Sequence, residues 1–155
     1  MSTTRPAPFT RILVTIDSSE NSIRAAKVAI DLAQRTQASL FVLHVIQIPA
    51  YTEVASPGMI SPPMMAQYID VAKKNAEKWV GDVVREAEAS GLKVRGEIIE
   101  NVPSVVQAIT DYASEWKVDL IVLGTRGLSG FRKLLLGSVS NGVLSHASCS
   151  ILVVR

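Results

Sequence analysis

Apolar residues follow two patterns along this chain, and the two patterns alternate. Four short segments are almost wholly apolar, at residues 11–17, 39–46, 119–123 and 150–154. Such runs are typical of strands that are buried on both faces of a parallel sheet. A fifth segment, 93–99, alternates at its start, which predicts a strand at a sheet edge.

Between these segments, apolar residues recur every three or four positions, the spacing of amphipathic helices. The stripe of the first helix consists of Ile23, Ala26, Ile30 and Ala33. Ser18 and Ser19 precede this stripe as candidate N-caps. A long helix is predicted at 64–90, with Gly91 as its C-cap.

Two further helices complete the pattern. One opens at Asn101-Val-Pro103, with Pro103 in its first turn, and runs to about Trp116. The other starts near Gly137. Strands that alternate with helices predict an α/β fold, a three-layer α/β/α sandwich around a five-stranded parallel sheet.

The chain is predicted to form one domain over residues 1–155. Its 155 residues are 48% apolar and 19% charged, a composition typical of a globular domain with a sizeable core. The N-terminal residues 1–10 are expected to be flexible. A proline-rich loop at 47–63 is long for a compact domain, and we expect it to act as a mobile flap.

Charge and cysteine content exclude several classes of protein. The net charge is only +2 and no run of five Lys or Arg occurs, which argues against a nucleic-acid partner. One cysteine, Cys149, excludes an internal disulfide and a Cys-rich zinc site. Because the chain has neither an apolar run of 18 residues nor a signal-peptide pattern, we expect no membrane span and a cytoplasmic location.

The most informative motif for function is a set of spaced glycines. Gly124 and Gly127 follow the apolar run 119–123, and Gly137-Ser138 stands nine residues later, at a predicted helix start. A glycine-rich turn before a helix lets the backbone approach phosphate, and the first N–H groups of the helix attract the anion. The alternative is a tight surface turn. The spacing matches neither a P-loop nor a dinucleotide fingerprint.

Other polar residues carry weaker signals. Asp17 ends the first strand, where its carboxylate would contact ribose, base or Mg²⁺, or serve only the following helix start. His44 lies within an apolar strand and is predicted to be structural. His146 suits the C-terminal end of the last helix, and Cys149 is predicted to pack as a small buried residue.

Taken together, these residues resemble the universal stress protein family. The family's nucleotide motif, Gly-x2-Gly-x9-Gly-[Ser/Thr], is matched by Gly124, Gly127, Gly137 and Ser138. The segments that also resemble its strand-end signatures are 12–17, 43–45, 102–103, 119–124 and 151–154. Two positions depart from the family pattern: Asn101 where glycine is frequent, and Ser150 where proline is frequent.

The resemblance implies a sandwich of the adenine nucleotide alpha hydrolase type, with strand order 3-2-1-4-5. It implies that ATP, with or without Mg²⁺, or a related adenine nucleotide is bound. Asp17 and the backbone of Val45 would line the adenosine pocket. The residues that would surround ribose and phosphates are Gly127, Gly130, Gly137, Ser138, Val139 and Ser140. The resemblance further implies a homodimer that pairs through the last strand.

The function that these observations favour is a nucleotide-binding module of stress response or signalling. One alternative is a slow ATPase or nucleotidyl transferase, in which Asp17 holds Mg²⁺ and Arg132 or Lys133 offsets phosphate charge. Another is a protein-interaction module without nucleotide, against which the intact glycine motif argues. No residue is placed as an obvious base for an attacking water, so the sequence favours a binder over an enzyme.

Overall fold

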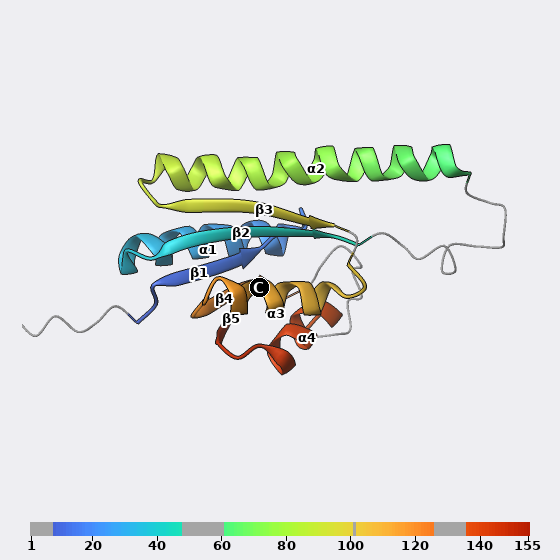
Figure 1. Cartoon of the computed structure of the whole chain (residues 1–155). Helices are drawn as coiled ribbons and strands as arrows, with labels where there is room; N and C mark the ends of the chain where they lie inside the picture. The colour runs from blue at the N-terminus through green and yellow to red at the C-terminus, as the bar shows by residue number, and fades with distance from the viewer. Residues whose placement is uncertain (1–7, 48–60, 101, 126–135) are drawn as a thin grey trace, which may run out of the picture.

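Five parallel strands form the centre of the protein in the order β3-β2-β1-β4-β5 (Figure 1). The computed structural model describes residues 8–47, 61–100, 102–125 and 136–155. The strands are β1 (Arg11–Thr15), β2 (Ser39–Ile46), β3 (Val94–Glu100), β4 (Leu120–Gly124) and β5 (Ser150–Val154). The helices are α1 (Glu20–Thr36), α2 (Pro62–Ala89), α3 (Val105–Glu115) and α4 (Ser138–His146).

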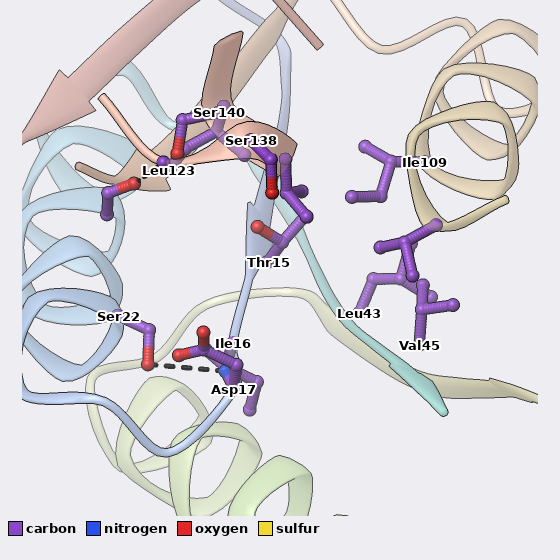
Figure 2. Close-up of a pocket in the computed structure, with 14 residues that line it drawn as sticks. Thr15, Ile16, Asp17, Ser22, Leu43, Val45, Ile109, Leu123, Ser138 and Ser140 are labelled. Atoms are coloured by element: carbon purple, nitrogen blue, oxygen red, sulfur yellow. Dashed lines mark hydrogen bonds between the residues drawn. The ribbon is translucent and has the colours of Figure 1, made fainter. Parts of the chain in front are cut away.

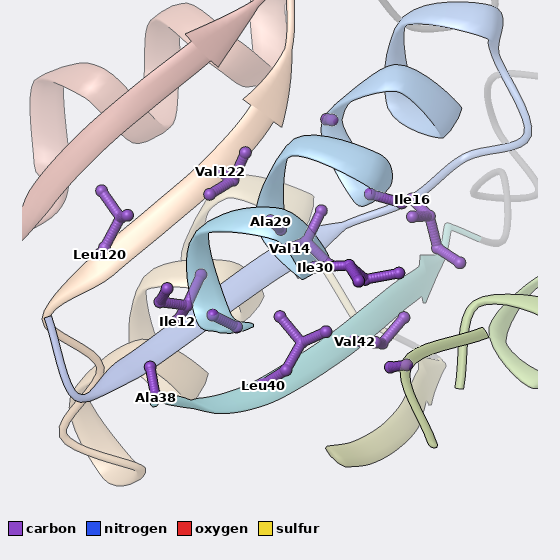
Figure 3. Close-up of a cluster of buried hydrophobic side chains, with 14 of the residues drawn as sticks. Ile12, Val14, Ile16, Ala29, Ile30, Ala38, Leu40, Val42, Leu120 and Val122 are labelled. Atoms are coloured by element: carbon purple, nitrogen blue, oxygen red, sulfur yellow. The ribbon is translucent and has the colours of Figure 1, made fainter. Parts of the chain in front are cut away.

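Alternate residues of the strands face two separate cores. Ile12 and Val14 of β1 pack with α1 and α2 on one face (Figure 3). Leu13, between them, packs with α3 and α4 on the other face. All three are fully buried, as the apolar run at 11–17 predicted. The α/β/α sandwich and the strand order 3-2-1-4-5 are therefore confirmed.

Small residues bring α1 close to the sheet. Ala25, Ala29 and Ala33 are fully buried on the face of α1 that meets the strands. Ser19 is the N-cap, because its side chain accepts a hydrogen bond from the Ser22 N–H at 3.1 Å. Of the two predicted N-caps, Ser19 is thus the one that caps.

The helix α2 is longer than predicted at its start. It begins at Pro62, two residues earlier, with both prolines in its first turn, where a missing N–H costs nothing. The predicted loop 47–63 is therefore shorter, and its residues 48–60 lie outside the described part of the chain. The N-terminal half of α2 extends beyond the sheet (Figure 1), and there Tyr68 is 53% exposed.

The start of α3 was predicted wrongly. The helix begins at Val105, and Pro103 lies before it. Ser104 is the N-cap, since its side chain accepts a hydrogen bond from the Gln107 N–H at 3.2 Å. The hydrogen bond of the Ser104 side chain therefore sets the start of the helix, whereas Pro103 is compatible with a helix start but does not fix its position.

The predicted strands 39–46 and 150–154 match β2 and β5, and the boundaries of the other three are shifted by one or two residues. Asp119, predicted as the first residue of a strand, instead precedes β4 and ties the chain ahead of β1. Its carboxylate accepts hydrogen bonds from the Thr10 N–H (2.8 Å), the Thr10 hydroxyl (2.7 Å) and the Arg11 N–H (3.0 Å). Within the described ranges, no helix has the length and apolar content to cross a membrane.

Candidate functional site

A cavity opens at the carboxyl ends of β1, β2 and β4, between the sheet and the helices α3 and α4. Seven of the nine predicted site residues line it: Asp17, Val45, Gly124, Gly137, Ser138, Val139 and Ser140. The other two, Gly127 and Gly130, lie outside the described residues. The parallel topology explains this gathering, because carboxyl ends of parallel strands meet at one edge of the sheet.

One wall of the cavity is apolar. Leu43 and Val45 alternate along β2 and therefore point to the same face of the sheet. Ile109, from α3, lies on the same side of the cavity (Figure 2). Val105 of α3 and Leu123 of β4 are further apolar lining residues. The wall offers a flat aromatic group an apolar surface without competing hydrogen bonds.

The facing wall is polar and includes the start of α4. Ser138 and Ser140 lie on the side of the cavity opposite Ile109 (Figure 2). Gly137 is the N-cap of α4, and no side chain caps the helix. Among the described residues, no acceptor is bonded to the N–H groups of Ser138, Val139 and Ser140. Three unpaired donors at the positive end of a helix dipole can hold an anion.

Asp17 is held at the cavity by the turn that joins β1 to α1. Its N–H donates to the Ser22 hydroxyl at 3.2 Å (dashed in Figure 2), and its Oδ1 accepts from the Ser19 N–H at 3.0 Å. Ser18, between Asp17 and Ser19, adopts a φ of 67°, which is uncommon for a residue other than glycine. Ser22 is 3% exposed, so its hydroxyl serves the turn itself.

Gly124 joins three parts of the polar wall. A Cβ on Gly124 would lie 2.8 Å from the Asn21 carbonyl carbon and 2.9 Å from the Ser22 nitrogen, so only glycine allows β4 to approach α1 this closely. The Gly124 carbonyl accepts a hydrogen bond from the Ser140 hydroxyl at 2.7 Å. Close packing therefore explains this glycine, in addition to the phosphate contact that the motif predicted.

Gly137 has a different environment from Gly124. Its φ of −69° and ψ of 164° are accessible to any residue. Its N–H donates to the Thr125 carbonyl at 2.6 Å and is not available to a ligand. Gly137 thus lines the cavity without a side chain, and the donors beside it belong to Ser138, Val139 and Ser140.

Several lining residues were not predicted from the sequence. They are Thr15, Ile16, Ser22, Leu43, Val105, Ile109 and Leu123. Two periodicities would have found part of this set. Leu43 stands two residues before Val45, so both share one face of a strand. Val105 and Ile109 are four residues apart on one helix face.

The remaining candidate residues lie away from the cavity lining. The ring nitrogen Nδ1 of His146 is bonded to the Gly142 carbonyl at 2.7 Å, one turn earlier in α4. Cys149 packs against the core below α3 and α4, and burial raises the pKa of its thiol, which disfavours a reactive thiolate. No cluster of three or more His, Cys, Asp or Glu suited to a metal ion occurs among the residues described.

The cavity lies where the strand order reverses, between β1 and β4. An α/β sandwich with a cavity at this position defines a class of ligand-binding domains. Comparison with known proteins identifies the family: the family model "Universal stress protein family" matches residues 8–155. The chain belongs to this family. It is 36% identical over 147 residues to a universal stress protein of Thermus aquaticus, covering 95% of this chain and 99% of that one. It is 33% identical over 149 residues to YxiE of Bacillus subtilis, with 95% and 99% covered.

Solved structures agree with this assignment. The universal stress protein UspA from Lactobacillus plantarum superimposes with a TM-score of 0.82 at 30% identity, over 95% of this chain and 98% of that one. Two more distant structures contain nucleotides. A universal stress protein in complex with cAMP has a TM-score of 0.63 at 24% identity, covering 95% and 97%. One from Archaeoglobus fulgidus in complex with dAMP has 0.64 at 17%, covering 95% and 98%.

Proposed function

We propose that this protein binds ATP or a related adenine nucleotide in the cavity at the carboxyl ends of β1, β2 and β4. The observation that carries the proposal is the pairing of an apolar wall with a polar wall that ends in unpaired helix N–H groups. A base and a phosphate group need these two environments. The relatives with cAMP and dAMP support adenine as the base.

In the proposed complex, the adenine lies against the apolar wall formed by Leu43, Val45 and Ile109. The backbone of Val45, next to the end of β2, would give the base its polar contact. The Asp17 carboxylate faces the same cavity and would accept hydrogen bonds from ribose or base hydrogens. Ser19 already occupies one of its oxygens, Oδ1, which leaves Oδ2 for this contact.

The phosphates would lie at the start of α4, on the N–H groups of Ser138, Val139 and Ser140. The cavity has a volume of about 130 Å³, below the roughly 300–1,000 Å³ of common small-molecule sites. A whole nucleotide would therefore extend beyond it. The family resemblance implies that Gly127 and Gly130 would take part in contacts with ribose and phosphates.

Mg²⁺ commonly uses one or two carboxylates together with phosphate oxygens. Asp17 is the one carboxylate among the described lining residues, and this fits Mg²⁺ bound with ATP but not a metal held by the protein alone. Hydrolysis is not part of the proposal. Arg132 and Lys133, which the enzymatic alternative needs, lie outside the described residues. A role in stress response or signalling and a cytoplasmic location stay predictions.

Calorimetric titration of the purified protein tests this function. We expect ATP to bind with one site per chain, and cAMP or AMP to compete for it. Absorbance of nucleotide released from the protein as purified gives an independent readout. A folded protein that binds none of these nucleotides and releases none would refute the proposal.

We further propose a homodimer through the edge of β5. β5 ends the sheet, and its sequence Ser-Ile-Leu-Val-Val has no charge. The opposite edge, β3, carries Arg95 and Glu97, which discourage pairing with another chain. Two copies of β5 related by a two-fold axis can pair antiparallel.

The direction of the β5 hydrogen bonds gives this proposal a sharp test. The Val154 carbonyl accepts a hydrogen bond from the Thr125 N–H at 2.8 Å, so the backbone N–H and C=O groups of Val154 point toward β4. The backbone groups of Leu152, two residues away, point the same way. The backbone N–H and C=O groups of Val153, between them, point to the free edge. We expect Val153→Pro to abolish a dimer seen at micromolar concentration in sedimentation, while the monomer stays folded. Leu152→Pro should instead unfold the sheet edge.

Wild-type protein that sediments as a monomer at high concentration would contradict the dimer. The nucleotide proposal would be unaffected, because none of the described lining residues belongs to β5.

A further inference from the structure

His44 makes one specific hydrogen bond at the end of β2. Its Nδ1 lies 2.7 Å from the Ile16 carbonyl oxygen. A carbonyl only accepts, so Nδ1 carries the proton and donates it. The imidazole ring also meets Trp79 of α2 edge to face, with centroids 5.4 Å apart and planes at 69°. The histidine thus has a fixed orientation and a fixed donor.

This bond holds Ile16, the residue just before the turn that leads into α1. β1 ends at Thr15, but the Ile16 N–H still donates to the Leu43 carbonyl at 3.0 Å. The His44 side chain then bonds the Ile16 carbonyl, where the strand ladder has stopped. Asp17 follows directly and starts the turn that carries its carboxylate to the cavity.

The turn has open space on both sides. Ile16 and Ser22 line the cavity described above, and they also line a second cavity of about 370 Å³ between α1 and α2. Trp79, the neighbour of His44, lines this second cavity. Ile16 itself is 5% exposed and packs in the core, whereas Ser18, two residues later, lines the second cavity. Hydrogen bonds therefore matter most for the part of the turn that follows Ile16.

From these contacts we propose that His44 is a positioning residue for the nucleotide pocket. Its Nδ1–H bond holds the turn from Ile16 to Ser19 in the place that presents the Asp17 carboxylate. The inference rests on the proposed function and deepens it. It also gives α2 a part in the site, because Trp79 orients the histidine ring.

Two substitutions separate the hydrogen bond from the packing of the ring. His44→Asn keeps a donor at the position of Nδ1 and removes the ring. His44→Phe keeps the ring and its contact with Trp79 but has no donor. We expect the dissociation constant for ATP to rise about tenfold in His44→Phe, the effect of one lost hydrogen bond, and to stay within about threefold in His44→Asn.

Val80→Ala is the matched control for stability. Val80 is 7% exposed and belongs to the core below α2, outside both cavity linings. This variant should lose stability without losing ATP affinity. If His44→Phe binds ATP as tightly as the wild type, or if both His44 variants lose affinity equally, the donor has no positioning role and the inference is wrong.

Hydrogen exchange of the Asp17 amide in the nucleotide-free protein gives a readout that does not depend on binding. The amide donates to Ser22 at 3.2 Å, and we expect faster exchange in His44→Phe than in His44→Asn. Should wild-type protein bind no adenine nucleotide, the proposed function fails, and the exchange rates still decide whether His44 holds the turn. Equal rates in the two variants would overturn the inference.

Discussion

Replacing Gly137 by valine is expected to weaken ATP binding by at least about 30-fold, roughly 2 kcal/mol. Gly137 lines the cavity beside the three unpaired N–H groups at the start of α4. A branched side chain there would occupy the space through which a phosphate reaches these donors. Titration calorimetry with ATP measures the loss.

The fold should survive this substitution. The φ of −69° and ψ of 164° at Gly137 suit valine, and the variant should lose only about 1 kcal/mol because valine is a poor N-cap. Ser61→Val is the matched control, since Ser61 is the N-cap of α2, also makes no side-chain cap bond, and has similar angles of −73° and 153°. That control should bind ATP normally. Unchanged ATP affinity in folded Gly137→Val protein would contradict the phosphate site.

Gly96→Val should be strongly destabilising, with a loss of about 3 kcal/mol in the free energy of unfolding. A Cβ on Gly96 would lie 2.6 Å from Val80 Cγ1 and 2.7 Å from Val84 Cγ2. Valine favours strands, so local preference alone would predict a gain in stability. The clash between β3 and α2 outweighs this preference, because closely packed side chains cannot move far enough to remove such short contacts.

Urea or thermal unfolding checks this expectation, and two further variants test its cause. Gly81→Ala, on α2 itself, should gain about 0.5–1 kcal/mol, since its Cβ meets only the flexible Arg85 side chain at 3.1 Å. Adding Val80→Ala to Gly96→Val should recover part of the loss, a non-additive effect of neighbours in contact. A Gly96→Val protein as stable as the wild type would contradict the close approach of α2.

The sequence by itself determined the type and order of the elements. The apolar runs at 11–17 and 119–123 predict buried strands because both faces of a parallel sheet are covered, so the signal survives without knowledge of the partners. The glycine motif located the candidate site at a strand end and a helix start for a similar reason. Backbone approach and helix N–H groups are local properties that follow from residue type and spacing.

Tertiary structure alone decided which distant residues share the site and why some small residues are needed. Gly124 and Gly96 meet atoms of α1 and α2, and their spacing in the sequence contains no trace of these contacts. The bond from His44 to Ile16 joins residues 28 positions apart. Such contacts depend on the relative placement of whole elements, which sequence periodicity does not specify.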